Sequence, residues 1–194
     1  MPNLYIISGC NGAGKTTASY TVLPEMLHCK EFVNADNIAS GLSPFNSDTV
    51  AFEAGRIMLN RIDELLKSNL DFAFETTLST RSYVSFIKKA HEKGYEVTLL
   101  YFWLNSPEMA IERVAKRVSK GGHNIPSEVI VRRYYRGIKN LFDLYIPVCD
   151  NWLVIENMDL IPEIISRSSN NKKGLEVLNE SIWQTIINQK DEIG

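Results

Sequence analysis

The chain has 194 residues and a formal net charge of −2, and 44% of its residues are hydrophobic. This balance is typical of a globular protein and predicts one domain over residues 1–194, large enough to bury a full core. The sequence lacks a strong basic excess, an apolar run of membrane-spanning length and a signal-peptide pattern, so we expect a cytoplasmic protein without nucleic-acid or membrane partners.

The first predicted element is a buried strand over residues 4–7, and a phosphate-loop pattern follows it directly. The loop has the full G-x-x-x-x-G-K-[ST] spacing and comprises Gly9, Cys10, Asn11, Gly12, Ala13, Gly14, Lys15, Thr16 and Thr17. Its glycines allow positive φ angles, so successive N–H groups can curl round a phosphate. Lys15 would lie between the β- and γ-phosphates, and the Thr16 hydroxyl would ligate Mg²⁺. We therefore predict that these residues bind ATP or GTP.

The three cysteines are scattered along the chain, at Cys10, Cys29 and Cys149. They show neither metal-ligand spacing nor an even disulfide set, which fits a reducing compartment. Cys10 lies inside the phosphate loop and could be redox-sensitive, although a small residue that simply fits there is the favoured interpretation.

Strand and helix signals alternate along the rest of the chain, which predicts an α/β fold with a parallel sheet. Helices are expected over residues 15–27, 47–67, 81–93, 106–120 and 127–145. Strands are expected over residues 31–34, 70–74, 95–104 and 152–156, with 95–104 central and 152–156 last. The polar stretch 167–173 is predicted to be a loop. A final amphipathic helix over about 174–189 is expected to pack on the domain rather than to recruit a partner.

Two acids stand where predicted strands end beside the phosphate loop. Ligands bind at the carboxyl ends of the strands in open α/β sheets, so Asp36 and Glu75 could contact Mg²⁺ or a substrate hydroxyl. Asp36 is the better candidate for a general base, because phosphoryl transfer to an alcohol needs a carboxylate that orients the attacking oxygen. The alternative for Asp36 is a helix or turn cap. Glu75, with the hydroxyls of Thr76 and Thr77, could hold a polar substrate.

A cationic segment over about 106–136 is predicted to form a lid. Arg113 and Arg117 lie four residues apart on one helical face, and the paired glycines Gly121 and Gly122 follow. Three further arginines stand on the next predicted helix, at Arg132, Arg133 and Arg136. Two helices joined by a flexible turn could close over ATP and bring positive charge to the transferring phosphoryl group. A solvated basic face is the alternative for any single arginine, and His123 in the turn could bind phosphate or be structural.

With these residues, the chain resembles the zeta toxin family of P-loop kinases over roughly residues 3–157. The resemblance is carried by Gly9-x4-Gly14-Lys15-Thr16, Val33-Asn34-Ala35-Asp36-x-Ile38-Ala39, Phe74-Glu75-Thr76-Thr77-Leu78-Ser79 and Arg117-Val118-x-x-Gly121-Gly122-His123-x-x-Pro126. It implies a P-loop kinase-like three-layer sandwich with a mainly parallel five-stranded sheet and a helical lid.

The resemblance also implies roles for individual residues. Characterised zeta toxins use ATP to phosphorylate the sugar 3′-hydroxyl of UDP-N-acetylglucosamine. By this resemblance Lys15 and Thr16 would hold phosphate and Mg²⁺, and Asp36 would be the catalytic base. The lid arginines Arg117 and Arg113 would stabilise the transferred phosphoryl group.

By the same resemblance, Glu75 and Thr77 would bind the substrate. Three positions depart from the family pattern. Leu59 aligns with a substrate-binding acid, and Ser79 with an arginine, so that Arg81 is the nearest arginine in this chain. His123 stands where the lid of the studied toxins has a second arginine.

The function predicted from the sequence is that of an ATP- and Mg²⁺-dependent small-molecule kinase. Its acceptor would be a hydroxyl of a nucleotide sugar such as UDP-N-acetylglucosamine, or of a related metabolite. The alternative is a regulatory P-loop NTPase that acts through a protein partner. The glycine-hinged arginine lid favours the kinase, because switch proteins lack one. An antitoxin is a further partner that the resemblance raises.

Overall fold

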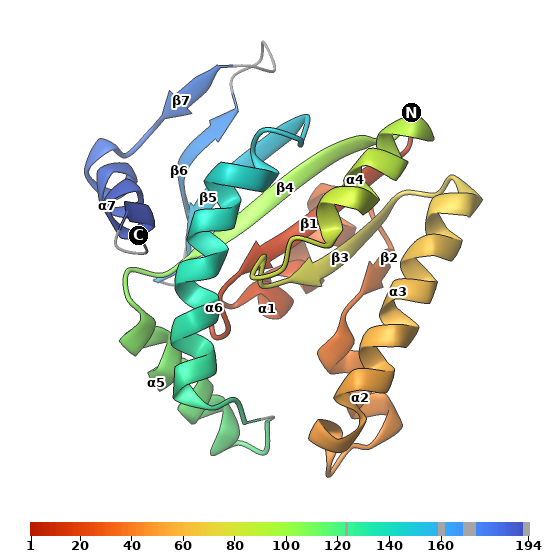
Figure 1. The fold of residues 1–194 in the computed structure, drawn as a ribbon, viewed down its shortest axis with the longest axis vertical. Coiled ribbons are helices and arrows are strands. Elements are labelled where there is room, and N and C mark those ends of the chain that lie inside the picture. The colour runs from red at the N-terminus through yellow and green to blue at the C-terminus, as the bar shows by residue number, and fades with distance from the viewer. Residues whose placement is uncertain (123, 159–161, 169–173, 192–194) are drawn as a thin grey trace.

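The computed structural model describes residues 1–122, 124–158, 162–168 and 174–191, which form a seven-stranded sheet flanked by helices (Figure 1). The strands are β1 (Asn3–Gly9), β2 (Glu31–Val33), β3 (Phe72–Thr76), β4 (Glu96–Trp103), β5 (Asn151–Glu156), β6 (Glu163–Ser168) and β7 (Leu175–Val177). The helices are α1 (Lys15–Thr21), α2 (Ala35–Leu42), α3 (Ala51–Ser68), α4 (Tyr83–Glu92), α5 (Pro107–Val118), α6 (Ser127–Asn140) and α7 (Glu180–Asp191). Turns of π-helix extend α1 over Val22–Met26 and α6 over Leu141–Tyr145.

Five parallel strands make up the central part of the sheet, in the order β2-β3-β1-β4-β5. In this register Leu4 of β1 lies opposite Phe72 of β3 and Val97 of β4, and all three side chains are fully buried. Strands that are covered on both faces need such continuous apolar sequence. Because the five strands run the same way, their carboxyl ends meet at one edge of the sheet.

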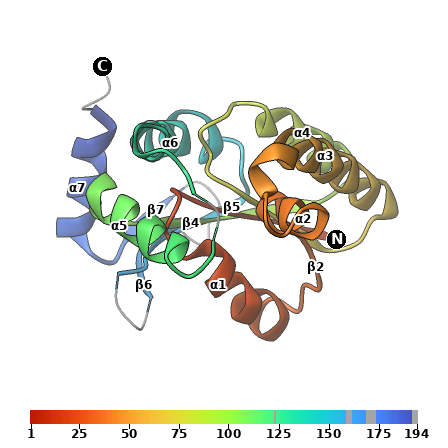
Figure 2. The ribbon, with the colours of Figure 1, turned by 90° about the horizontal axis from the view of Figure 1, so that it is seen from below.

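Helices cover both faces of the sheet. α3, α4 and α6 lie on one face and α1 lies on the other (Figure 2). At the edge where the parallel strands end, α5 and α6 stand opposite α2 and α3 (Figure 1). The predicted three-layer α/β fold with a mainly parallel sheet is therefore confirmed.

The predicted boundaries of two helices agree with local capping. The Ser106 hydroxyl accepts a hydrogen bond from the Met109 N–H at 3.2 Å, and Pro107 is the first residue of α5. After α4, Gly94 has φ +77° and donates its N–H to the His91 carbonyl. Glycine takes this left-handed conformation without steric cost, so the helix ends there.

The predicted strand count is wrong, because β6 and β7 extend the sheet beyond β5 as antiparallel strands. Residues 152–156 are therefore not the last strand, and the predicted loop over 167–173 begins inside β6 with Arg167 and Ser168. Residues 169–173 lie outside the described residues. In β6 the two isoleucines are adjacent instead of alternating with polar residues, and β7 has only three residues, so neither gives a clear period-two pattern.

The final helix starts later than predicted. Leu175 belongs to β7, and α7 begins at Glu180. Asn179 sets this start, because its side-chain oxygen accepts a hydrogen bond from the Ile182 N–H at 3.2 Å. Trp183 and Ile186 are buried, so the helix packs on the sheet as predicted.

Helix α2 was not predicted, although its cap is visible in the sequence. The Asn34 side chain accepts hydrogen bonds from the backbone N–H groups of Asp36 and Asn37, which starts α2 directly after β2. Asp36 thus lies in the first turn of a helix, and Asn34 is the capping residue. None of the helices in the described ranges is both long and apolar enough to cross a membrane.

Candidate active site

The phosphate loop leaves β1 and enters α1 through three glycines with positive φ. The φ angles are +136° at Gly9 and +81° at both Gly12 and Gly14. A Cβ atom at Gly12 would lie 2.8 Å from the Ala110 carbonyl oxygen, and one at Gly14 would collide with the side-chain nitrogen of Asn157. The backbone conformation therefore favours glycine at both positions, and at Gly12 the space beside the Ala110 backbone also requires it.

Glu75, at the end of β3, contacts the two residues that were predicted to hold phosphate and Mg²⁺. The Lys15 ammonium is buried, donates to the Cys10 carbonyl at 2.9 Å and lies 3.5 Å from Glu75 Oε1. The Thr16 hydroxyl donates to Glu75 Oε2 at 2.7 Å, and the Asn34 side chain donates to the same oxygen at 2.7 Å. The predicted substrate-binding carboxylate thus lies on the phosphate loop itself.

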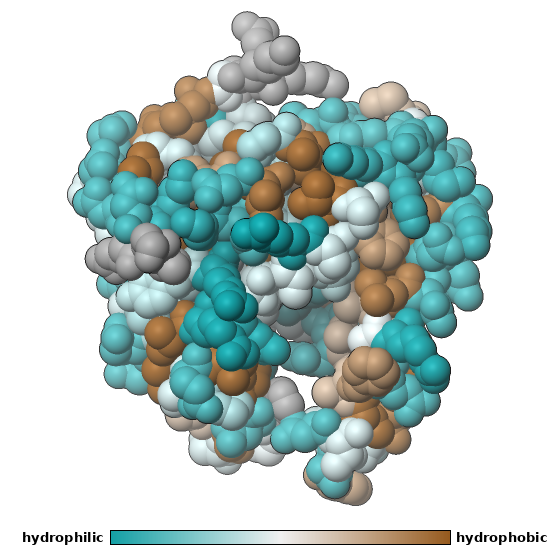
Figure 3. Space-filling model, viewed as in Figure 1, coloured by the Kyte–Doolittle hydropathy of each residue, from teal (hydrophilic) through white to brown (hydrophobic). Residues whose placement is uncertain are grey.

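A cavity of about 270 Å³ opens over the loop and brings most of the predicted site residues together. It is lined by Asn11, Gly12, Gly14, Lys15, Thr16, Thr17, Asp36, Glu75, Arg113 and Arg117. Asp36 also lines a smaller hollow of about 50 Å³ between α2 and the start of α3, with Ala35, Ala39, Ser47 and Ala51. In space-filling view the lower half of the molecule is divided between the lobe with α5 and α6 and the lobe with α2 and α3 (Figure 3).

The residues around this cavity fit a nucleoside triphosphate with Mg²⁺. A buried ammonium, a threonine hydroxyl and a glycine cradle are the groups that hold such a ligand. Among the described residues no cluster of three or more histidine, cysteine, aspartate or glutamate side chains could hold a metal ion. Mg²⁺ needs no such cluster when phosphate oxygens supply most of its ligands.

Arg113, on α5, lines the cavity but its guanidinium is directed to the segment after β5. It donates to the carbonyl oxygens of Asn157 at 2.8 Å and Met158 at 3.0 Å. Asn157 in turn donates its side-chain N–H to the Ala13 carbonyl at 2.7 Å. Arg113 therefore connects the lid helix, the end of β5 and the phosphate loop. Sequence reasoning missed Asn157, since an asparagine after a strand gives no distinctive signal.

Arg133, on α6, is a second cation of the predicted lid, and it reaches the loop. Its guanidinium donates to the Asn11 side-chain oxygen at 3.2 Å. Burial lowers the pKa of Arg133, while the nearby Asp36 carboxylate acts in the opposite direction. The sequence marked this residue only as one of three arginines on the helix. Arg117 lines the cavity from α5, whereas His123 lies outside the described residues.

Within the described chain, the predicted substrate residues Thr77 and Arg81 do not line this cavity. The Thr77 hydroxyl is hydrogen-bonded to the Ser79 hydroxyl at 2.9 Å, in the loop that follows β3. Asn140 of α6 donates to the Leu78 carbonyl at 2.7 Å and holds this loop in place. Arg81 is exposed just before α4.

Cys10 is almost completely buried beneath the loop. Burial raises the pKa of its thiol to about 11. A protonated, inaccessible thiol is a poor nucleophile, which supports its interpretation as a small packing residue.

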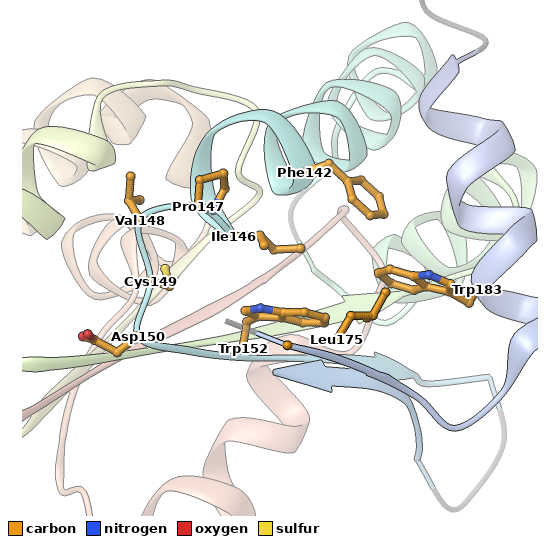
Figure 4. A pocket seen from close by; sticks show the side chains of 10 residues that line it. Phe142, Ile146, Pro147, Val148, Cys149, Asp150, Trp152, Leu175 and Trp183 are labelled. Atoms are coloured by element: carbon orange, nitrogen blue, oxygen red, sulfur yellow. The ribbon is translucent and has the colours of Figure 1, made fainter. Parts of the chain in front are cut away.

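A larger cavity of about 710 Å³ lies at the opposite end of β5 from the phosphate loop (Figure 4). Its wall contains Trp152 and Trp183, whose stacked rings have centroids 6.1 Å apart, and Phe142 above them. Asp150 is the one charged residue among its described lining residues. This apolar lining does not suit a phosphate group, so the smaller cavity is the candidate active site.

Comparison with known proteins places this geometry in a family context. A family model described as Zeta toxin matches residues 1–145. A Haemophilus influenzae protein, described only as uncharacterised, is 32% identical over 127 residues, which are 65% of this chain and 88% of that protein.

Two solved structures share the fold at low sequence identity. A chain from the AvrRxo1-ORF1:-ORF2 complex with ATP is 20% identical with a TM-score of 0.74, over 96% of this chain. The present chain spans only 63% of that one. A chain from the PezAT toxin–antitoxin system of Streptococcus pneumoniae is 15% identical with a TM-score of 0.65, over 99% of this chain and 87% of its own length.

Proposed function

The chain belongs to the zeta toxin family, and on this premise we propose that it is an ATP- and Mg²⁺-dependent kinase that phosphorylates a hydroxyl of a small molecule. The observation that carries the proposal is the single cavity in which Lys15 and Thr16 face the Asp36 and Glu75 carboxylates and the lid arginines. This arrangement would supply a phosphate cradle, a base and positive charge together, as phosphoryl transfer requires.

Lys15, Thr16 and the loop glycines would hold the triphosphate and its metal ion. ATP supplies the phosphoryl group, and Mg²⁺ neutralises the charge that develops on the phosphate oxygens. The ATP-containing structure with the same fold supports the choice of ATP. Glu75 would keep the Thr16 hydroxyl proton directed away from the metal, because Thr16 already donates it to Glu75.

Asp36 would be the general base. Its carboxylate is exposed at the start of α2 and lies where the phosphate cavity meets the hollow between α2 and α3. An acceptor bound beside the exposed Asp36 carboxylate would bring its hydroxyl between Asp36 and the phosphate loop. The carboxylate would orient the hydroxyl and take its proton as the new oxygen–phosphorus bond forms and the bond to ADP breaks.

Positive charge for the transferred group would come from the lid helices. Arg117 and Arg113 line the cavity on α5, and Arg133 reaches the loop from α6. Cations that approach the phosphoryl oxygens stabilise charge in the transition state more than in the ground state.

For the acceptor we propose a nucleotide sugar such as UDP-N-acetylglucosamine, or a related metabolite. Glu75, Thr77 and Arg81 are the residues proposed to bind it. Leu59, which stands in place of an acid, is 40% exposed on α3. Ser79, which stands in place of an arginine, is uncharged and is hydrogen-bonded to Thr77. These differences favour a close relative of the nucleotide sugar as much as UDP-N-acetylglucosamine itself.

We also propose that an antitoxin protein restrains the enzyme. The support is the structural likeness to chains from the PezAT toxin–antitoxin system and from the AvrRxo1-ORF1:-ORF2 complex.

A mass-spectrometric screen tests the kinase proposal. The purified protein is incubated with Mg²⁺-ATP and a pooled extract of polar metabolites to which UDP-N-acetylglucosamine is added. Asp36→Asn serves as the inactive variant. Asp63→Asn is its matched control, because Asp63 lies far along α3 in a surface pair with Lys67.

A product heavier by one phosphate on the nucleotide sugar, formed by the wild type and by Asp63→Asn only, would support both the reaction and the substrate. Phosphate on another metabolite would retain the kinase and replace the acceptor. ATP binding without any phosphorylated product would overturn the small-molecule kinase and favour a nucleotide-controlled protein partner.

A further inference from the structure

Asn34 is a buried polar residue between β2 and α2, with 4% of its surface exposed. Its side-chain oxygen accepts hydrogen bonds from the Asp36 N–H at 2.8 Å and the Asn37 N–H at 3.1 Å. Its side-chain nitrogen donates to Glu75 Oε2 at 2.7 Å and lies 3.4 Å from the Thr16 hydroxyl. Both ends of the amide are therefore occupied.

These contacts fix the orientation of the amide. Two backbone N–H groups can only donate, so the group that faces them must be the carbonyl oxygen. The NH₂ group then faces Glu75, whose ionised carboxylate can only accept. A reversed amide would place donor against donor and acceptor against acceptor.

The amide spans the two halves of the proposed active site. On one side it contacts Glu75, which also holds the Thr16 hydroxyl and lies near Lys15. On the other side it holds the backbone of Asp36 at the first turn of α2. We propose that Asn34 is a positioning residue that couples the phosphate- and Mg²⁺-binding side of the site to the first turn of α2, which carries Asp36. This inference rests on the proposed function.

The physical effect of Asn34 is to hold one carboxylate oxygen of Glu75 on Thr16. With this hydrogen bond, the Thr16 proton is committed to Glu75 Oε2. The Asn34 nitrogen, 3.4 Å from the Thr16 oxygen, faces one of its lone pairs, which leaves the other lone pair to a cation. Without the hydrogen bond from Asn34, Glu75 can turn toward the Lys15 ammonium, which lies only 3.5 Å from its other oxygen. The carboxylate would then release the Thr16 hydroxyl, whose oxygen is the proposed Mg²⁺ ligand.

Serine separates this role from helix capping. Serine caps a helix about as well as asparagine, but its side chain is too short to reach both the α2 N–H groups and Glu75. The test variant is therefore Asn34→Ser. Asn37→Ser is the matched control, because the exposed Asn37 side chain donates to the Tyr20 hydroxyl outside the cavity.

Titration calorimetry with ATP, once in Mg²⁺ and once in EDTA, measures the effect without any acceptor. The ratio of the two Kd values is the Mg²⁺ enhancement of binding. In Asn34→Ser we expect this ratio to fall about 10–100-fold, the usual effect of losing a partner of a metal-binding group, with metal-free affinity within about twofold of wild type. In Asn37→Ser the ratio stays at the wild-type value.

A double-mutant cycle with Glu75→Ala tests whether Asn34 acts through Glu75. In that background the acceptor oxygens are already absent, so adding Asn34→Ser leaves the Mg²⁺ enhancement within about twofold of Glu75→Ala alone. A merely structural role would give equal losses in both backgrounds. Circular dichroism checks that each variant is folded. If Asn34→Ser is unfolded, Asn34→Thr replaces it, because threonine is also a capping residue and is larger than serine.

The positioning role is overturned if Asn34→Ser retains the wild-type Mg²⁺ enhancement of ATP binding, or if the losses of this enhancement are additive in the cycle. Either result would leave the kinase proposal intact. Absence of Mg²⁺-dependent ATP binding in the wild type would overturn the proposed function and the inference together. The two failures are thus distinguished by the wild-type titration.

Discussion

The two carboxylates at the phosphate loop have different surroundings, which suits different roles. Glu75 is held by Thr16 and Asn34 and lies beside Lys15. Asp36 is held through its backbone, and its exposed carboxylate faces two adjoining hollows. A fixed acid can organise phosphate and metal binding, whereas an accessible one can receive a proton from an entering hydroxyl.

The Asp36→Asn substitution tests this division of roles. It should leave ATP affinity unchanged but lower kcat by about 10²–10⁴-fold, the usual contribution of a positioned general base. Calorimetry with ATP and a turnover assay with the acceptor found in the metabolite screen measure the two quantities. A rate near that of the wild type would mean that Asp36 is not the general base and only forms part of the first turn of α2.

The two arginines of α5 should differ in what they stabilise. Arg113→Lys replaces a guanidinium that spans two carbonyl oxygens with a single ammonium, so we expect the free energy of unfolding to fall by about 1.5–3 kcal/mol. Urea unfolding followed by circular dichroism measures this loss.

Arg117→Ala is the counterpart on the same face of α5. We expect kcat to fall by roughly 10³-fold, as when a cation that contacts the phosphoryl group is removed. Equal rates for Arg117→Ala and wild type would mean that another cation of the predicted lid stabilises the transferred phosphoryl group. Arg133, already at the loop, is the next to test in the same assay.

At the scale of elements, the sequence predicted the parts that have strong periodicity or clear caps. The five parallel strands, the helices α1, α3, α4, α5 and α6 and the Ser106 cap appear where expected, because buried strands and amphipathic helices repeat their apolar residues regularly. The short α2 and the edge strands β6 and β7 lack that regularity. The start of α2 is set by the local Asn34 cap, whereas β6 and β7 depend on tertiary pairing, of β6 with β5 and of β7 with β6.

Helix α7 shows how the C-terminal elements are held. Trp183 is buried, with its ring stacked on Trp152 and 5.3 Å from the centre of Phe142. Trp183→Ala should therefore lower the free energy of unfolding by about 3 kcal/mol or more. Urea denaturation measures it, and the exposed neighbour change Gln184→Ala should cost less than about 0.5 kcal/mol. Truncation of a buried tryptophan usually costs more than about 1 kcal/mol. A smaller loss for Trp183→Ala would therefore mean that α7 contributes little to stability.

At the scale of the whole molecule, the parallel sheet explains which site residues could be predicted. Strands that run the same way bring their carboxyl ends together, so the phosphate loop, Asp36 and Glu75 could be placed at one edge from the sequence alone. Asn157 and Arg133 could not, because their places depend on how α5, α6 and the segment after β5 approach the loop. The assigned roles of these residues stay predictions.

Burial of the cysteines should make the protein less stable at alkaline pH. Burial raises the pKa of Cys10 and of Cys29 to about 11, whereas an unfolded thiol ionises near about 8.5. Below the unfolded value both states are protonated, and the thiols have no effect. Above it the unfolded chain loses protons that the folded protein retains, so the free energy of unfolding decreases as pH rises from about 8.5 toward 11.

The Cys10→Ala variant isolates one of these thiols. Urea unfolding between about pH 7.5 and 10 should give a shallower decline for Cys10→Ala than for the wild type, because one ionisation that favours the unfolded chain is gone. Ser19→Ala, which removes a buried hydroxyl that does not ionise, should retain the wild-type slope. Buried tyrosines with raised pKa values, such as Tyr145, act in the same direction in all three proteins and cancel in the comparison. Equal slopes for Cys10→Ala and wild type would mean that the thiol ionises as readily in the folded protein as in the unfolded chain, which its burial beneath the phosphate loop argues against.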